Sequence, residues 1–307
     1  MKRISAAALL FIALAFASAK EIAVLTIGNS FAQSAFVYLP SVVKSAPGCS
    51  LHLEGANHGG CSLSRHWRYI SEEEKDPSVR RYRNGKSTLR QILQSRKWDI
   101  ITIQQASHES WRPETYFPCA EKLRDYIKKC APTAEICIQQ TWSYRADDPR
   151  ISKGGRWNID QSEMFARAEK NYADAAKKLG LRIIPTGKAV QNYRSQETRP
   201  FEPACFSTYR YPDLPPQSGD VVGRTFWRKQ KDGEMRISRD TIHLNDNGNY
   251  LQACLWFGFL FGKNPEEISF VPDTIANSQA AKLRSIAAQT LAEFKQPKDA
   301  QQQAARD

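Results

Sequence analysis

Two patterns of apolar residues follow one another along this chain. Short runs rich in isoleucine and valine are typical of strands buried on both faces of a parallel sheet. Such strands are predicted at residues 21–27, 98–105, 135–140 and 181–185, and an alternating segment predicts a further strand at 49–55. Segments with apolar residues at helical spacing separate and follow these strands. They predict helices at 31–39, 62–67, 89–97, 119–130, 161–179, 187–196, 248–261 and 275–294.

Strands that alternate with helices predict an α/β fold. We expect a three-layer, flavodoxin-like parallel sheet of about five strands, with right-handed crossovers and helices on both faces. One domain is expected over residues 20–295, followed by a polar tail at 296–307. Residues 71–86 are highly charged and predict a surface excursion. Residues 199–238, rich in proline and aromatic side chains, interrupt the alternation and predict an insertion of loops with room for a hairpin.

The first 19 residues have the pattern of a secretory signal peptide. A basic start at Met1–Arg3 precedes an apolar run at 6–16 and an Ala-Ser-Ala cleavage pattern at 17–19. We therefore expect export to the periplasm or the exterior, with cleavage near Ala19. A membrane anchor is the alternative interpretation, but the apolar run is too short to span a bilayer. The apolar segment 248–261 is also too short, so stable membrane insertion is not expected.

The net charge and the cysteines narrow the choice of partners. The chain has 44 Lys and Arg against 32 Asp and Glu, a formal charge of +12. A basic surface suits an anionic substrate such as an acidic glycan, or nucleic acid, although a solvated basic surface is the simpler explanation. Nucleic acid is disfavoured because the positive residues are dispersed and no nucleic-acid motif occurs. Seven cysteines suit an oxidising compartment, but their pairing and the oligomeric state stay open.

A serine and an Asp-x-x-His segment carry the candidate chemistry. Ser30 follows the first predicted strand in Gly28-Asn29-Ser30, at a strand-to-helix turn where free N–H groups favour an oxyanion. A simple N-cap is the alternative role for Ser30. Asp240 and His243 are three residues apart, on a predicted loop or first helical turn. A carboxylate at that spacing can orient an imidazole as the base for a serine hydroxyl.

These residues resemble the sequence blocks of the SGNH (GDSL-type) hydrolases, and in particular an exported, poorly characterised branch of them. Gly28-Asn29-Ser30 matches the first block, Gly60 the oxyanion glycine of the second, and Asp240 with His243 the fifth. Asn29 stands where the family usually has Asp. The third-block Gly-x-Asn-Asp is missing. A glutamine amide can donate a hydrogen bond as asparagine does, so Gln105 is expected to complete the oxyanion hole with the Ser30 and Gly60 amides, and Gln104 is the alternative.

The resemblance implies a serine esterase that needs no cofactor, and we expect it to be a carbohydrate O-acetylesterase. Asn29, His108 and Trp142 are expected to contact the substrate, with Trp142 stacking on a sugar ring or lying half-buried in its loop. No nucleotide-binding or metalloprotease motif occurs, and five histidines make a metal cluster unexpected. A lipid esterase or thioesterase is one alternative. A glycan-binding protein that kept the fold and lost turnover is another.

Overall fold

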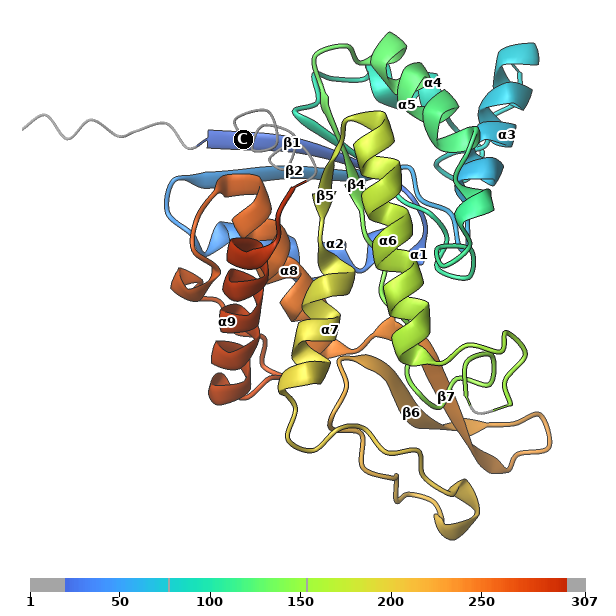
Figure 1. Ribbon diagram of the computed structural model, residues 1–307, viewed down its shortest axis with the longest axis vertical. Coiled ribbons are helices and arrows are strands. Elements are labelled where there is room, and N and C mark those ends of the chain that lie inside the picture. Colours follow the sequence, from blue (N-terminus) through green and yellow to red (C-terminus); the bar gives the residue numbers. More distant parts are fainter. Residues whose placement is uncertain (1–19, 77, 153, 297–307) are drawn as a thin grey trace, which may run out of the picture.

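The central sheet has five parallel strands. The computed structural model describes residues 20–76, 78–152 and 154–296, so the predicted signal peptide and nearly all of the polar tail lie outside the described residues. The strand order is β2-β1-β3-β4-β5 (Figure 1), as in flavodoxin-like proteins. The strands are β1 (Lys20–Ile27), β2 (Cys49–Gly55), β3 (Ile100–Ile103), β4 (Glu135–Gln139) and β5 (Arg182–Ile184). The predicted fold class is confirmed.

Helices cover both faces of this sheet. Along β1, Ile22 and Val24 face one core, whereas Ala23, Leu25 and Ile27 face the other, because successive side chains of a strand point to opposite sides. The first core is closed by α2 (Ala35–Lys44), α7 (Thr186–Gln196), α8 (Asp246–Phe261) and α9 (Asn277–Glu293). The second is closed by α3 (Leu63–Lys75), α4 (Leu89–Gln94), α5 (Cys119–Cys130) and α6 (Gln161–Leu179). The three layers are visible in Figure 1.

Helix α8 is buried on nearly all sides. It packs between α2 and α9 within the first core, which explains why its sequence is apolar all round rather than on one stripe. Trp256 at its centre is buried and donates from Nε1 to Thr186 Oγ1 at 3.3 Å. Within the described ranges, no helix combines the length and the apolar character that a membrane span requires.

The charged segment 71–86 contains more regular structure than the sequence predicts. Helix α3 continues through Lys75, where a surface excursion was expected to begin at residue 71. Glu73 lies on the buried side of this helix and accepts the backbone N–H groups of Arg81 at 2.8 Å and Leu89 at 2.9 Å. One buried carboxylate thus fixes the following loop to α3. The charged composition of the segment does not predict this contact.

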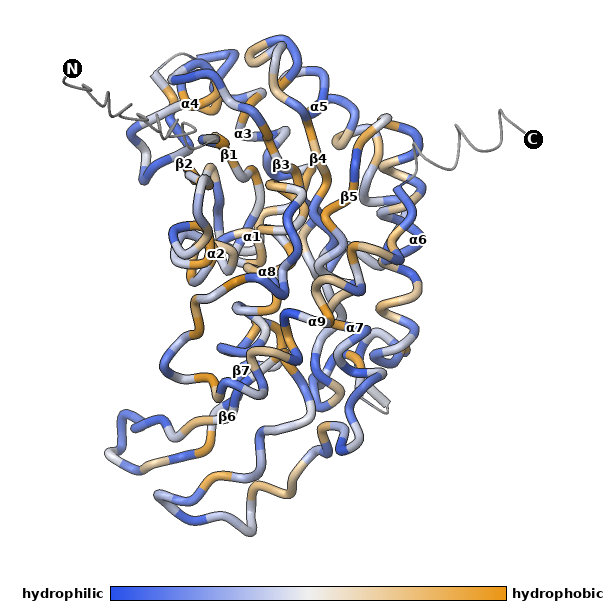
Figure 2. Tube along the Cα trace, turned by 90° about the vertical axis from the view of Figure 1, so that its left-hand side faces the viewer, coloured by the Kyte–Doolittle hydropathy of each residue, from blue (hydrophilic) through white to orange (hydrophobic). Residues whose placement is uncertain are grey.

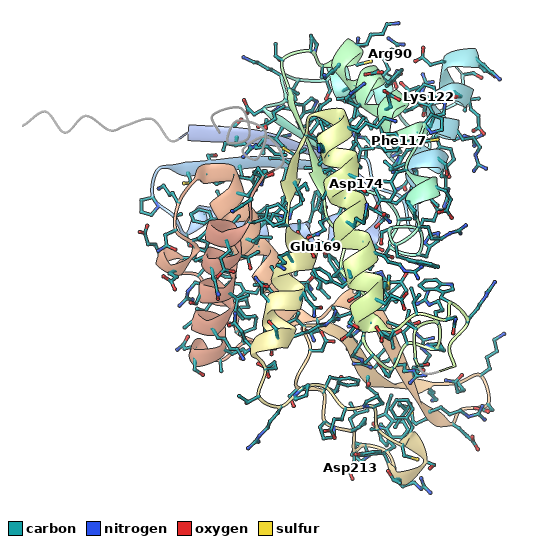
Figure 3. The ribbon with its side chains drawn as sticks, viewed as in Figure 1. Arg90, Phe117, Lys122, Glu169, Asp174 and Asp213 are labelled. Carbon is teal, nitrogen blue, oxygen red and sulfur yellow. The ribbon has the colours of Figure 1, made fainter. Side chains whose placement is uncertain are left out.

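The predicted insertion contains a hairpin of functional importance. Loops with a short 3-10 turn, Phe206–Thr208, lead to β6 (Val222–Lys229) and β7 (Met235–Leu244), which pair antiparallel as a separate sheet. Asp213 lies at the far end of the insertion from the main sheet (Figure 3), and Figure 2 likewise shows β6 and β7 at the opposite end of the molecule from β1–β5. Strand β7 runs beyond residue 238, so Asp240 and His243 stand on a strand. The expectation of a loop or helical turn there is wrong.

Candidate active site

Ser30 is placed by the turn that leaves the central strand β1. It is the first residue of the short helix α1 (Ser30–Gln33), and Asn29 is the N-cap, with its Oδ1 accepting the N–H of Phe31 at 3.0 Å. The Asn29 amide also donates to the carbonyl of Cys61 at 3.1 Å. Asn29 therefore ties the serine turn to the Gly59-Gly60-Cys61 loop, and Ser30 itself is not the cap.

A buried histidine forms a hydrogen bond with the backbone of this turn. His66 on α3 is fully buried, with Nε2 3.0 Å from the Gly28 carbonyl and Nδ1 3.0 Å from the Tyr82 hydroxyl. A carbonyl can only accept, so Nε2 carries the proton and the Tyr82 hydroxyl donates to Nδ1. Burial lowers the pKa of His66 to about 3, against the smaller opposing effect of the Gly28 hydrogen bond. The neutral ring fixes the residue that precedes Asn29.

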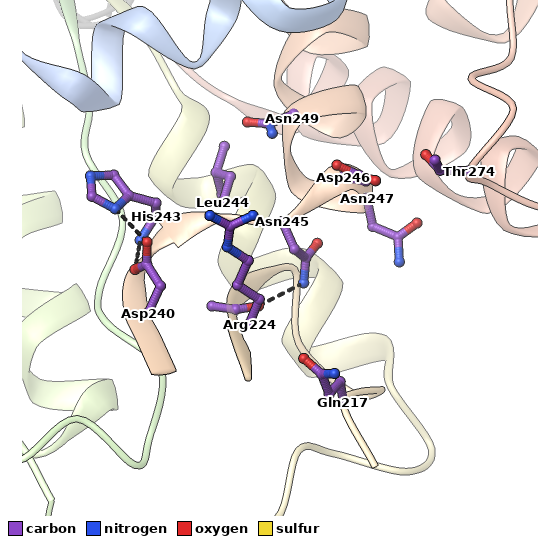
Figure 4. Close-up of a pocket in the computed structure, with 11 residues that line it drawn as sticks. Gln217, Arg224, Asp240, His243, Leu244, Asn245, Asp246, Asn247, Asn249 and Thr274 are labelled. Carbon is purple, nitrogen blue, oxygen red and sulfur yellow. Dashed lines mark hydrogen bonds and ion pairs between the residues drawn. The ribbon is translucent and has the colours of Figure 1, made fainter. Parts of the chain in front are cut away.

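The three predicted catalytic side chains form one hydrogen-bonded relay. His243 Nε2 lies 2.9 Å from Ser30 Oγ, and His243 Nδ1 lies 2.7 Å from Asp240 Oδ2. Asp240 Oδ1 accepts the backbone N–H groups of Ile242 and His243, both at 3.0 Å. Figure 4 shows the carboxylate of Asp240 turned towards the imidazole. The order of hydroxyl, imidazole and carboxylate is that of a nucleophile, its base and the group that orients the base.

The carboxylate of Asp240 stays charged over a wide pH range. Partial burial disfavours the charged form, but hydrogen bonds from the ring and backbone of His243 and from the Ile242 amide outweigh it. Together they hold the pKa of Asp240 well below its ordinary value. An ionised Asp240 keeps the proton of neutral His243 on Nδ1, so Nε2 is free to accept from Ser30.

The loop after β4 clamps the two residues between Asp240 and His243. Trp142 donates from Nε1 to the Ile242 carbonyl at 2.8 Å, and Arg145 donates its N–H to the Thr241 carbonyl at 2.9 Å. The Thr241 hydroxyl donates to Asp148 Oδ2 at 2.6 Å. Asp148 is buried and paired with Arg150. The clamp fixes the end of β7 against the main domain and so fixes the relay.

Two amides are available to an oxyanion beside Ser30. Within the described part of the chain, the N–H groups of Ser30 and Gly60 have no acceptor. Gly60 has φ +59, a left-handed conformation that glycine adopts without the steric cost of a side chain. A cavity of about 350 Å³ joins Ser30, Gly60 and His243.

Gln105 does not reach this cavity. Its Nε2 donates to the carbonyl and hydroxyl of Thr115, at 2.9 and 3.1 Å, and its Oε1 accepts from Leu63 and Ala106. The expected oxyanion role of Gln105 is therefore corrected to a structural one, since a buried amide with these partners is not available to substrate. Gln104 does not line the cavity either, and its buried side chain packs against Gly28.

Of the three residues expected to contact the substrate, two line this cavity and one does not. His108 lines the 350 Å³ cavity with Tyr144 and Arg150, and Asn29 lines it from the serine turn. Trp142 is only 1% exposed and stacks face to face on Phe31, with ring centroids 4.0 Å apart. It cannot stack on a sugar, and the prediction that it contacts substrate is wrong. Trp142 instead supports Phe31 and the end of β7.

A second cavity, of about 400 Å³, is also lined by Ser30 and His243. Val37 and Leu244 are its aliphatic side chains, and the remaining lining residues are polar or glycine. Two of them, His58 and Asn249, have buried acceptor atoms, Nε2 and Oδ1, without a hydrogen-bond partner within the described protein. Burial and the nearby Arg65 lower the pKa of His58, so its ring is neutral. The sequence pattern did not single out Asn249.

The sequence pattern did not single out several residues of this site. His66 could have been placed in the core, because it falls between Leu63 and Ile70 on the apolar side of α3. Asp148 and Arg150 lie in a polar loop without a motif, and their role depends on a contact 93 residues away, with Thr241. Such long-range pairings are not encoded in local spacing.

The sheet order and the position of the serine, aspartate and histidine define the class: this is a flavodoxin-like α/β protein that carries a Ser-His-Asp relay at the carboxyl edge of its sheet. More narrowly, the chain belongs to the family known as domain of unknown function DUF4886, which matches residues 23–210. That match includes Ser30 and Gly60 and ends before Asp240.

Three solved structures illustrate the likeness. A DUF4886 family protein from Bacteroides uniformis is 25% identical, with a TM-score of 0.69 over 89% of this chain and 96% of that chain. A proposed SGNH hydrolase from Slackia heliotrinireducens is 20% identical, with a TM-score of 0.47 over 79% and 100%. A proposed GDSL-like lipase from Parabacteroides merdae is 13% identical, with a TM-score of 0.46 over 81% and 99%. No match was found among curated proteins.

Proposed function

We propose that this protein is an exported serine esterase that removes small acyl groups, acetyl in the first place, from the hydroxyl groups of a carbohydrate. The observation that carries the proposal is the continuous relay from Asp240 through His243 to Ser30, with its distances of 2.7 and 2.9 Å. The N–H groups of Ser30 and Gly60 border the same cavity and have no acceptor among the described residues. A surface serine that only capped a helix would need neither the oriented imidazole nor the open amides.

The reaction begins with attack of Ser30 Oγ on the ester carbonyl carbon. His243 Nε2 takes the hydroxyl proton, and the carbonyl oxygen, now negative, accepts from the Ser30 and Gly60 N–H groups. His243 then gives that proton to the departing sugar oxygen as the ester C–O bond breaks, which leaves an acyl group on Ser30. Water, deprotonated by the same imidazole, attacks the acyl-enzyme. A carboxylic acid is released and the Ser30 hydroxyl is restored.

The two cavities favour a short acyl group and a hydroxylated alcohol. The 350 and 400 Å³ cavities that both contain Ser30 in their lining are small. The side-chain amides of Gln33, Asn57 and Asn249 line the larger cavity, and they can donate hydrogen bonds to sugar hydroxyls and accept hydrogen bonds from them. A long apolar acyl chain would form no hydrogen bonds with these amides, and this supports a carbohydrate ester over a lipid ester.

The test compares esters of one alcohol across acyl chain lengths. We expect 4-nitrophenyl acetate to be hydrolysed with a higher kcat/KM than 4-nitrophenyl octanoate, and acetylated sugars to be substrates. Ser30→Ala should lower kcat by roughly 10⁴–10⁶-fold while the protein stays folded. A preference for octanoate would favour a lipid esterase. A wild-type protein that binds sugars but turns over no ester would favour a binding protein.

Export is a separate part of the proposal and depends on residues 1–19, which lie outside the described structure. Mass spectrometry of the protein purified from its native host should find an N-terminus near Lys20. An intact Met1 on the mature protein would contradict export through a cleaved signal peptide.

A further inference from the structure

A third pocket, of about 770 Å³, shares His243 and Leu244 with the cavity at Ser30. It lies between the hairpin and the start of α8 (Figure 4). Arg224 of β6 lines it, and the strand register sets Arg224 directly opposite Asp240 of β7. The place of this arginine relative to the relay is thus fixed by backbone pairing.

Four arginines near the hairpin and the loop after β4 are paired with aspartates, and Arg224 is not paired with any described aspartate. Arg145, Arg150, Arg194 and Arg239 each form an ion pair with an aspartate. Arg224 forms none with the described residues, although Asp240 is its cross-strand neighbour. Both Asp240 oxygens are held by the backbone and ring of the Asp240–His243 segment. The Arg224 guanidinium instead extends alongside Asn245 into the pocket, as Figure 4 shows, near the Phe226 ring at 5.4 Å.

The rest of the pocket suits a hydroxylated ligand. Side-chain amides of Gln217, Asn247 and Asn249 line it and supply both donors and acceptors. Asn249 also lines the cavity beside Ser30, so one ligand can extend from the serine into this pocket. Two carboxylates line this pocket and oppose an anion there, Asp246 in the first turn of α8 and Asp240 of the relay.

We propose that Arg224 binds an anionic group of the substrate, so that the enzyme acts on acetyl esters of acidic sugars. The inference rests on the proposed esterase function and names its substrate class. A guanidinium fork matches the two oxygens of a carboxylate, and also those of a sulfate, through paired N–H···O bonds. The acidic group then lies on the hairpin side of His243, while the acetyl ester lies over Ser30.

Three matched substrates test this inference. They are 3-O-acetyl methyl galactosides that carry a hydroxyl, a carboxylate or a sulfate at carbon 6. We expect the wild type to prefer at least one charged sugar to the neutral sugar by roughly 10- to 100-fold in kcat/KM, the usual worth of a charge-assisted hydrogen bond. The preferred anion distinguishes a uronic acid from a sulfated sugar.

Arg224→Gln should remove this preference, mainly through KM. Arg228→Gln is the matched control, because Arg228 stands on the same strand, 5.3 Å from the same Phe226 ring, but does not line the pocket. It should keep the preference. Asp246→Asn should strengthen it. The inference is overturned if the wild type shows no preference for either charged sugar, or if the preference survives in Arg224→Gln.

A binding measurement separates this inference from the esterase proposal. Calorimetry with Ser30→Ala and the charged and neutral methyl galactosides needs no turnover. One outcome is that Ser30→Ala binds the charged sugars selectively, the double variant with Arg224→Gln does not, and the wild type hydrolyses no ester. That outcome would support the anion site and refute the esterase. Hydrolysis of 4-nitrophenyl acetate without charge-selective binding would leave the esterase standing and refute the anion site.

Discussion

Replacing His66 by glutamine should make the protein less sensitive to acid. Glutamine can donate to the Gly28 carbonyl and accept from the Tyr82 hydroxyl, the two bonds that His66 makes at 3.0 Å each. It cannot be protonated at the pH values concerned. The variant therefore removes one titrating group and keeps the hydrogen-bond pattern that supports the serine turn.

The size of the effect follows from the pKa of His66. It falls from 6.5 in the unfolded chain to about 3 in the folded protein, where the ring is fully buried. As the pH falls, the unfolded chain takes up this proton first, so the stability contributed by neutral His66 is complete above pH 6.5 and is lost on the way down to about pH 3. Between pH 7 and pH 4.5 this single group lowers the free energy of unfolding by roughly 2.5 kcal/mol.

Urea unfolding followed by tryptophan fluorescence at pH 7 and pH 4.5 measures this loss. The wild type should lose roughly 2.5 kcal/mol more than His66→Gln over that interval. His52→Gln is the control, because the His52 side chain is 36% exposed and pairs with Glu54 at the surface. It should behave as the wild type does. Equal losses in the wild type and His66→Gln would refute the assignment of a buried neutral imidazole.

Three further substitutions test the relay and its supports. Asp240→Asn should lower kcat on 4-nitrophenyl acetate by roughly 10³–10⁴-fold because the imidazole loses its orienting charge, and a loss below tenfold would count against the triad. Gly60→Ala should lower kcat by roughly 10- to 100-fold, since φ +59 at this residue disfavours a side chain, whereas Gly59→Ala, which has no positive φ, should have little effect. Asp148→Asn should lower both Tm and kcat, because it weakens the hydrogen bond that holds Thr241. Thr241→Val should lower both quantities as well, with Tm measured by calorimetry and kcat by kinetics. An unchanged Tm would contradict the clamp.

The sequence was most informative where function depends on local geometry. Only Gly28 and Asn29 separate Ser30 from the apolar strand that ends at Ile27, so its place at the carboxyl edge of the sheet could be predicted. Asp240 and His243 are close enough in sequence for a carboxylate to reach an imidazole in several local conformations, including the strand in which they actually stand. Their pairing was therefore predictable, although their secondary structure was not.

The sequence misled where a side chain had long-range partners. Gln105 lies at the expected strand end, but Thr115 and Leu63 hold its amide, and neither contact could be inferred from its neighbours. Trp142 also follows a strand, yet its ring stacks on Phe31 and donates a hydrogen bond to the Ile242 carbonyl. Arg224 gained its position through the register of a hairpin, which in a proline-rich, weakly patterned segment could not be read from the sequence.

Labelling with a fluorophosphonate tests the central claim most directly. Such a probe reacts with serine hydroxyls that are activated by a neighbouring base. Residues 20–307 would be treated with the probe, digested and analysed by mass spectrometry, with Ser30→Ala and His243→Ala treated in parallel. We predict one label on Ser30 of the wild type, none at any serine in Ser30→Ala, and far slower labelling in His243→Ala. A wild-type Ser30 that stays unlabelled, or that reacts equally well in His243→Ala, would contradict a catalytic relay in this protein.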